Sequence, residues 1–142
     1  MNLLETAIAF ALDVHQGQLD RAGQPYILHP LHLMCQMDTE DERLVALLHD
    51  TIEDSDRTLA DLQALGLPAH VLEAIDLLTH DKQAMSYEAY VARLQPNPLA
   101  RKVKLADLRH NMDLRRLPQI TANDAARLDK YRQAWEQLTR RS

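Results

Sequence analysis

Four ionisable side chains lie close together at the end of an apolar run. The run occupies residues 44–48, and His49, Asp50, Glu53 and Asp54 follow it. In a helix, side chains four residues apart share a face, so these residues form two neighbouring polar ridges. Burying such groups without partners costs several kcal/mol, and a metal ion is the simplest partner. The alternative is a helix end whose acidic side chains are solvated.

A histidine earlier in the chain is a second candidate for metal binding. His29 precedes Pro30. A proline favours an extended residue before it and is well suited to the first position of a helix, so we expect His29 to be fixed at a helix entrance. The alternative role for His29 is a buried side chain that caps this helix.

A carboxylate late in the chain is a third candidate. Asp107 stands in an apolar part of a predicted helix, so its side chain faces inward or nearly so. Lys104 and Asn111 share its ridge at intervals of three and four residues. The alternative for Asp107 is an ion pair with Lys104 or Arg109.

Three further histidines are weaker candidates for a role in the chemistry. His15 ends the inward face of a predicted helix, where a core or capping role is expected. His32 is expected to be a partly exposed helix residue. The pair His80 and Asp81 lies in a polar connection after a helix, and we expect it to be unrelated to the site.

The strongest candidates form a set of two imidazoles and two carboxylates: His29, His49, Asp50 and Asp107. Mn²⁺ and Fe²⁺ suit such ligands and Zn²⁺ is compatible with them, whereas Mg²⁺ and Ca²⁺ prefer more oxygen. Such an ion would lower the pKa of a bound water and polarise a phosphorus centre. Glu53 and Asp54 could then take a proton from that water or return one to the leaving oxygen. The set therefore predicts a metal-dependent phosphohydrolase.

Helices are expected to position these side chains, because apolar residues recur at intervals of three and four through most of the chain. The expected helices cover residues 3–18, 31–37, 40–52, 59–65, 68–78, 87–94, 99–117 and 121–139. Thr39 and Glu42 form a capping-box pattern at the start of the 40–52 helix. Glycines and a proline mark residues 17–26 as a loop, and such loops commonly carry ligand contacts.

The composition agrees with an all-α fold, in which residues 1–142 form a single compact helical bundle. Hydrophobic residues make up 46% of the chain and charged residues 26%, with only 3 Gly and 6 Pro. These proportions are typical of a soluble globular protein and argue against disorder.

Charge and cysteine content restrict the partners and the compartment. The formal net charge is −5, and basic residues never cluster beyond pairs. Binding to a nucleic-acid backbone is therefore disfavoured, whereas a small anionic ligand held by a metal is compatible. Cys35 is the only cysteine, which indicates a reducing compartment. Residues 1–12 contain no basic leader and are too short to span a bilayer, so we expect a cytoplasmic protein.

Three motifs in the same order resemble the hydrolase domain of RelA/SpoT-type alarmone enzymes, a branch of the HD phosphohydrolases. They are His29-Pro30, then His49-Asp50 with Glu53-Asp54, then Lys104-Leu105-Ala106-Asp107 with His110-Asn111-Met112. The resemblance implies an all-helical HD domain, an Mn²⁺ ion and removal of pyrophosphate from the 3′ position of ppGpp or pppGpp, the alarmones of the stringent response. The length resembles that of the small members without a synthetase domain.

The resemblance also implies roles for individual residues. The metal ligands would be His29, His49, Asp50 and Asp107, the catalytic acids Glu53 and Asp54, and the substrate-binding residues Arg21, Lys104 and Asn111.

Two departures from the family pattern keep other functions open. The family loop usually reads Arg-Lys-Ser-Gly, whereas this chain has Asp20-Arg21-Ala22-Gly23, and Leu108-Arg109 reverses the usual order after the last metal acid. The altered loop favours an HD phosphatase for another nucleotide, such as NADPH or a nucleoside monophosphate. A module that senses a nucleotide without cleaving it and a structural helical domain are the remaining alternatives.

Overall fold

Helices follow one another along the chain in the computed structural model, which describes residues 1–53 and 55–140. In chain order they are α1 (Leu3–His15), α2 (Leu28–Cys35), α3 (Glu40–Leu48), α4 (Leu59–Gln63), α5 (Ala69–Leu78), α6 (Tyr87–Leu94), α7 (Pro98–Asn111), the 3-10 helix η1 (Leu114–Arg116) and α8 (Ala122–Thr139). These described ranges contain no β-strand, and the all-α prediction is confirmed. None of the described helices is both long enough and apolar enough to cross a membrane.

Local capping bonds determine where several helices begin. Thr39 accepts a hydrogen bond from the backbone of Glu42, whose side chain accepts one from the backbone of Thr39. The same reciprocal pair begins α8, between Thr121 and Asp124. Each pair satisfies amide donors that the first turn of a helix leaves open. The capping box predicted at the start of α3 is therefore confirmed.

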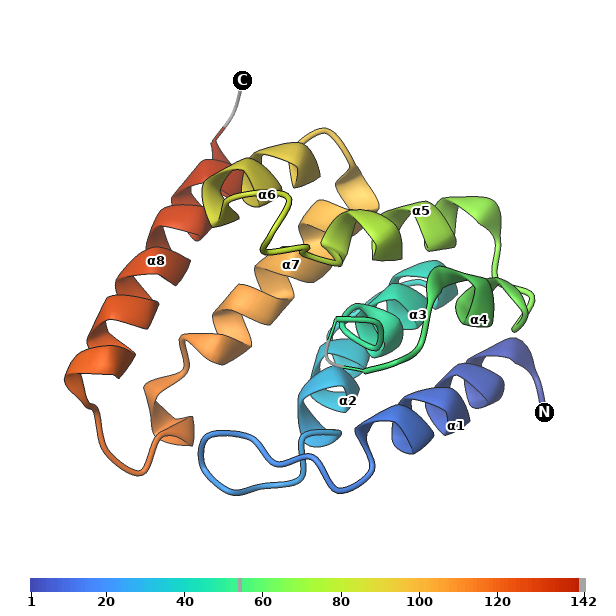
Figure 1. The fold of residues 1–142 in the computed structure, drawn as a ribbon, viewed down its shortest axis with the longest axis horizontal. Coiled ribbons are helices and arrows are strands. Elements are labelled where there is room, and N and C mark those ends of the chain that lie inside the picture. Colours follow the sequence, from blue (N-terminus) through green and yellow to red (C-terminus); the bar gives the residue numbers. More distant parts are fainter. Residues whose placement is uncertain (54, 141–142) are drawn as a thin grey trace.

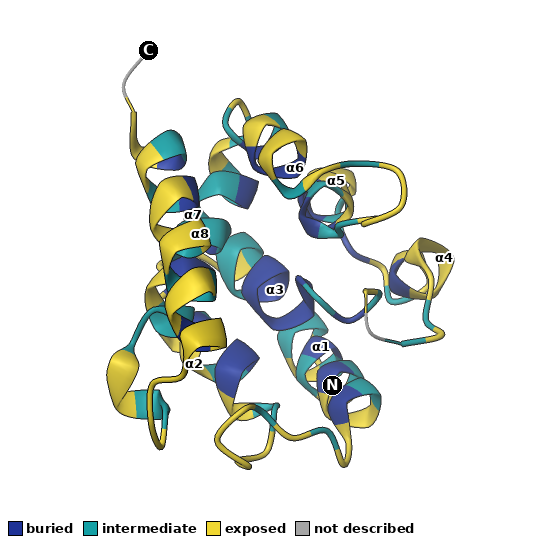
Figure 2. Cartoon of the chain, turned by 60° about the vertical axis from the view of Figure 1, so that its left-hand side comes forward, coloured by how far each residue is buried: buried dark blue, intermediate teal, exposed yellow. Residues whose placement is uncertain are grey.

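The helix α3 lies at the centre of the bundle, in contact with α1, α2, α5 and α7 (Figure 1). Its last five residues, from Leu44 to Leu48, are all buried. A helix that is apolar on every side is expected where neighbours surround it. By contrast, α8 exposes its outer face to solvent (Figure 2). The C-terminal end of α3 therefore delivers the residues that follow it into the interior.

The central helix ends earlier than the predicted 40–52, because α3 stops at Leu48 and the chain continues in turns. The His49 ring bonds to the carbonyl of Ala46 at 2.7 Å, which is the acceptor that the next helical amide would use. The amide and hydroxyl of Thr51 both bond to the carbonyl of Leu48, at 3.2 Å and 2.9 Å. These local bonds replace helical ones, so His49 caps a helix rather than lying within it.

The helix α7 also ends before the predicted residue 117. Its last residue is Asn111, and the Met112 amide bonds to the carbonyl of Leu108. The Asp113 side chain then accepts a hydrogen bond from the Arg115 amide and begins η1. The segment after α7 therefore turns away as a separate short helix.

Candidate active site

Three buried side chains from different parts of the bundle meet at one point. His29 comes from α2, His49 from the end of α3 and Asp107 from α7. One ligand atom from each lies within 4.8 Å of the others. His29 Nε2 is 2.8 Å from Asp107 Oδ1, and His49 Nε2 is 3.5 Å from the same oxygen. We call these three residues the His-His-Asp cluster.

The second nitrogen of each imidazole in the cluster is also engaged. His49 Nδ1 donates to the carbonyl oxygen of Ala46 at 2.7 Å, which leaves its Nε2 facing Asp107. His29 Nδ1 lies 2.7 Å from Nδ1 of His110. Histidines that bind metals are commonly held in this way, with one nitrogen bonded to the protein and the other turned to the ion. The donor set and its orientation therefore fit a divalent cation.

The pKa values of ionisable groups in the cluster differ strongly from their usual values. Burial alone would lower the pKa of His49, but the neighbouring charges of Asp50 and Asp107 outweigh it and raise the pKa to about 9. Burial would raise the pKa of Asp107, but Lys104 and the two imidazoles hold it well below its usual range. Such opposed perturbations in a cleft are typical of functional sites.

Lys104 and Asn111 both hold the carboxylate of Asp107. Lys104 Nζ donates to Oδ2 at 3.0 Å, and Asn111 Nδ2 donates to Oδ1 at 3.1 Å. Only 11% of the Lys104 side chain is exposed. The ion pair left open as an alternative role for Asp107 is thus present, and it leaves Oδ1 directed at the histidines.

Asp50 lies at the edge of the His-His-Asp cluster rather than within it. Its Oδ2 is 3.8 Å from His49 Nε2 and accepts a hydrogen bond from the Tyr26 hydroxyl. Its Oδ1 lies 3.5 Å from Nε2 of His15, which is buried as expected. The structure therefore places Asp50 beside the cluster but does not include it in the three-residue group.

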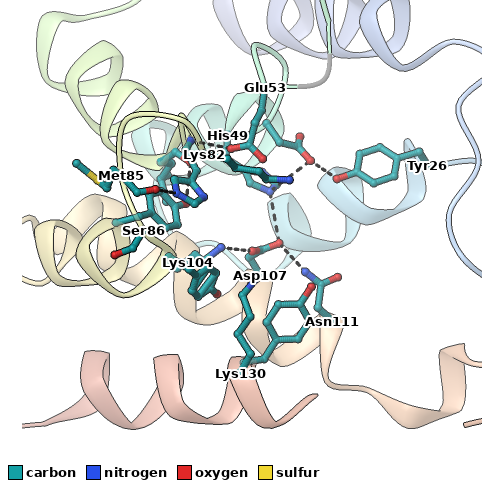
Figure 3. A pocket seen from close by; sticks show the side chains of 16 residues that line it. Tyr26, His49, Glu53, Lys82, Met85, Ser86, Lys104, Asp107, Asn111 and Lys130 are labelled. Atoms are coloured by element: carbon teal, nitrogen blue, oxygen red, sulfur yellow. Dashed lines mark hydrogen bonds and ion pairs between the residues drawn. The ribbon is translucent and has the colours of Figure 1, made fainter. Parts of the chain in front are cut away.

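A cavity of about 480 Å³ opens over His49 and Asp107 of the cluster (Figure 3). Its lining includes Glu53, Tyr87, Lys104, Lys130 and Tyr131. The size falls within the range of small-molecule sites. Lysine side chains beside a potential cation site would suit an anionic ligand.

Of the two predicted catalytic acids, the structure describes one. Glu53 is exposed and lines the cavity, where its Oε1 accepts a hydrogen bond from the His80 amide at 2.7 Å. Asp54 lies outside the described residues.

The aromatic wall of the cavity was not predicted as part of the site. Tyr87 and Tyr90 of α6 both line the cavity, and Tyr90 is at the same time a buried residue of the core. His80, expected to be unrelated, also lines it and stacks on Tyr90 with ring centroids 4.5 Å apart. Lys130 lies over the Tyr87 ring, 4.1 Å from its centroid. The spacing of the two tyrosines on α6 indicates an inward face, but it does not distinguish a core position from a position in the wall of a cavity.

Arg21 lines a neighbouring cavity of about 230 Å³ instead of the main one. The two cavities share Tyr26, Asn111 and Tyr131 in their lining. The smaller cavity also contains Arg116, whose guanidinium lies 3.6 Å from the carboxylate of Asp20. Of the predicted substrate-binding residues, the structure thus brings Lys104 and Asn111 to the cluster and leaves Arg21 in the adjoining cavity.

Comparisons with known proteins place the chain beside enzymes of alarmone metabolism. It is 34% identical over 122 residues to the bifunctional (p)ppGpp synthase/hydrolase SpoT of Escherichia coli K12, covering 77% of this chain and 17% of that protein. It is 30% identical over 144 residues to a GTP pyrophosphokinase of Myxococcus xanthus, covering 90% of this chain and 19% of the relative. The chain therefore spans less than a fifth of the length of these two relatives. No protein-family model matches the sequence.

A solved structure shares the fold over nearly the whole chain. It is described as a metazoan ortholog of SpoT that hydrolyzes ppGpp, and it matches with a TM-score of 0.76 at 24% identity, covering 98% of this chain and 86% of the other.

A smaller relative is matched over most of its own length. It is the guanosine-3′,5′-bis(diphosphate) 3′-pyrophosphohydrolase MESH1 of Danio rerio, 35% identical over 127 residues that cover 80% of this chain and 69% of the relative. With this identity over more than two thirds of the relative, the chain belongs to the family of guanosine-3′,5′-bis(diphosphate) 3′-pyrophosphohydrolases.

Proposed function

We propose that this protein removes pyrophosphate from the 3′ position of ppGpp or a closely related nucleotide. We also propose that it uses a divalent cation, with Mn²⁺ as the first candidate. The single observation that carries the proposal is the His-His-Asp cluster, whose ligand atoms lie within 4.8 Å of one another beneath a cavity with lysines in its wall. The family relationship supplies the substrate class.

The cluster would hold the cation through His29, His49 and Asp107, with Asp50 as the fourth ligand from the edge. A bound cation would polarise the phosphorus centre and make water a stronger nucleophile at neutral pH. Fe²⁺ and Zn²⁺ are also compatible with two imidazoles and two carboxylates.

The remaining residues of the cavity would bind the nucleotide and move protons. Glu53 lines the cavity and would accept a proton from water, and we assign the same type of role to its neighbour Asp54. Lys82 and Lys130 line the same cavity and would attract the phosphate groups. Arg21 and Asn111 would contact the nucleoside side of the substrate, because Asn111 lies on the boundary between the two cavities.

A second candidate substrate follows from Asp20, which stands where the family usually has a basic residue. Its carboxylate lies 3.6 Å from Arg116 and so offsets one positive charge of the smaller cavity. This pairing favours a nucleotide with fewer negative charges than ppGpp on that side. NADPH and nucleoside monophosphates are the alternatives to test.

A substrate panel tests the proposed function. The purified protein is incubated with Mn²⁺ and with ppGpp, pppGpp, NADPH or GMP, and the products are separated by anion exchange. We expect the protein to release pyrophosphate from ppGpp and pppGpp, and we expect this release to stop when a chelator is added. Phosphate from NADPH or GMP alone would favour the second candidate. Tight binding without any product would overturn the enzymatic assignment in favour of a sensing module.

The role of Glu53 is tested by Glu53→Gln, which keeps the shape of the side chain but cannot accept the proton. We expect turnover to fall roughly 100-fold or more, as general acid–base groups commonly contribute that much, while Mn²⁺ affinity stays unchanged. His49→Ala is the matched variant that loses the cation. Full activity of the Glu53 variant would show that another group accepts the proton.

We further propose that residues 1–142 act as one catalytic domain in the cytoplasm, on a nucleotide rather than on nucleic acid. The single cysteine and the net charge of −5 support this assignment.

A further inference from the structure

His110 makes an unusual contact with one of the cluster histidines. Its Nδ1 lies 2.7 Å from Nδ1 of His29, and the two residues come from α7 and α2. Both groups are ring nitrogens, so one proton must be shared between them if each ring is neutral. The position of this proton decides which nitrogen of His29 is free to bind a cation.

The two rings lie side by side and not face to face. Their planes differ by only 6°, and their centroids are 5.0 Å apart. This separation is about the sum of the 2.7 Å contact and the radii of two imidazole rings, so the contact lies in a common plane. A short contact along the ring plane is the geometry of a near-linear hydrogen bond.

The His110 ring has a second neighbour, which packs against its face and not against its edge. His32 stacks on it, with centroids 3.9 Å apart and planes 16° apart. The backbone carbonyl of His110 accepts a hydrogen bond from Arg116 at 3.0 Å. The bond to Arg116 therefore holds His110 independently of the stacking contact with His32.

The other nitrogen of His29 faces the cluster, 2.8 Å from Asp107 Oδ1. A cation can use this Nε2 only when its proton is absent, and the neutral ring must then carry the proton on Nδ1. That proton needs an acceptor, because a buried donor without a partner is costly. Nδ1 of His110 is the acceptor that the structure provides.

We propose that His110 is a positioning residue for the metal centre: it accepts the Nδ1 proton of His29 and so presents the Nε2 lone pair of His29 to the cation. This inference rests on the proposed metal-dependent function, but it concerns cation binding and not the identity of the substrate. It assigns His110 of the His110-Asn111-Met112 motif a role distinct from that of a ligand.

Mn²⁺ affinity, measured by electron paramagnetic resonance with the metal alone, tests the proposal in four proteins. His110→Leu removes the acceptor, His110→Asn offers a replacement oxygen near the position of Nδ1, and His32→Leu removes the stacking contact but keeps the acceptor. Loss of a residue that orients a metal ligand typically weakens affinity by roughly 10- to 100-fold. We expect that loss for His110→Leu, recovery of most of it for His110→Asn, and affinity close to that of the wild type for His32→Leu.

The outcomes separate this inference from the proposed function. Equal Mn²⁺ affinity in the wild type and His110→Leu would overturn the positioning role alone. Equal losses in His110→Leu, His110→Asn and His32→Leu would indicate general packing and would overturn it as well. Absence of Mn²⁺ binding by the wild type would overturn both the inference and the metal-dependent function. If the four proteins show the expected Mn²⁺ affinities but the wild type does not hydrolyse ppGpp, the inference is supported and only the proposed activity is contradicted.

A second measurement needs no variant. Long-range ¹H–¹⁵N spectra of the wild-type protein loaded with diamagnetic Zn²⁺ report which imidazole nitrogens carry protons. We expect a proton on His29 Nδ1 and on His110 Nε2. A proton on His110 Nδ1 would contradict the proposal even if every substitution at residue 110 prevented folding.

Discussion

At the scale of single residues, the site depends on how the charge of one buried carboxylate is compensated. One carboxylate oxygen of Asp107 accepts a hydrogen bond from Lys104, and the other oxygen faces the imidazoles of His29 and His49. Residue types and spacing pointed to these groups, since His29, His49 and Asp107 were all candidates. The position of Asp50 could not be predicted, because its bond to Tyr26 joins residues 24 positions apart in the chain.

Replacing Lys104 by methionine should destabilise the protein strongly. The change leaves the buried Asp107 without its ion-pair partner, and removing one member of a buried pair costs about 3 kcal/mol or more. Urea denaturation of the metal-free protein measures this loss. Added Mn²⁺ should reduce it, because a cation in the cluster also compensates Asp107.

The control for Lys104→Met is Lys82→Met, since Lys82 is exposed on the same cavity. A surface substitution of this kind is expected to change stability by less than about 0.5 kcal/mol. Equal stability of the two variants would contradict the buried ion pair.

At the scale of helices, the sequence predicted where most elements begin better than where they end. The Thr39–Glu42 box begins α3 as expected, because capping depends on residues three positions apart. The end of α3 was misplaced because the His49 ring and the Thr51 hydroxyl bond to backbone carbonyls, and residue spacing alone does not reveal such bonds. Because the His49 ring bonds to Ala46 through Nδ1, its Nε2 faces Asp107 in the cluster.

Removing the cap of α3 should lower the stability of the whole fold. Thr39→Ala deletes the oxygen that bonds to the Glu42 amide, and losses of this kind cost about 1 kcal/mol. The free energy of unfolding from chemical denaturation measures the effect. Thr39→Ser keeps the hydroxyl and should stay close to the wild type, so equal losses in both variants would refute the capping role.

The cap of α8 should make stability depend on pH. The Thr121 amide, together with Arg127 and the Thr121 hydroxyl, lowers the pKa of Asp124 from 3.8 to about 2. Because the folded-state pKa lies below the ordinary one, Asp124 stabilises the protein above pH 3.8, and this contribution is lost as the pH falls toward 2.

The difference in unfolding free energy between the wild type and Asp124→Asn measures this contribution across pH. We expect a constant difference near neutral pH that shrinks below about pH 4, where the Asp124 carboxylate of the unfolded chain becomes protonated before that of the folded protein. Asp129→Asn, an exposed acid on the same helix, controls for the change in net charge. A difference that is unchanged or larger at pH 3 would contradict the lowered pKa.

At the scale of the whole molecule, the bundle brings together side chains that lie far apart in the chain. His29 and Asp107 are 78 positions apart, yet their ring nitrogen and carboxylate oxygen are 2.8 Å apart. Its apolar surroundings predicted that Asp107 faces inward or nearly so, and Pro30 predicted that His29 lies at a helix entrance. The combined ligand set and the family resemblance predicted that the two residues meet. Neither predicted that Arg21 lines a separate cavity or that tyrosines of α6 line the main one, because both depend on how α6, α8 and the 17–26 loop pack.

A crystal structure of the protein soaked with Mn²⁺ tests the central claim most directly, because anomalous scattering locates the ion independently of any assay. We predict one strong peak within coordination distance of His29 Nε2, His49 Nε2 and Asp107 Oδ1. A peak elsewhere, or no peak while these three side chains turn away from one another, would contradict the account.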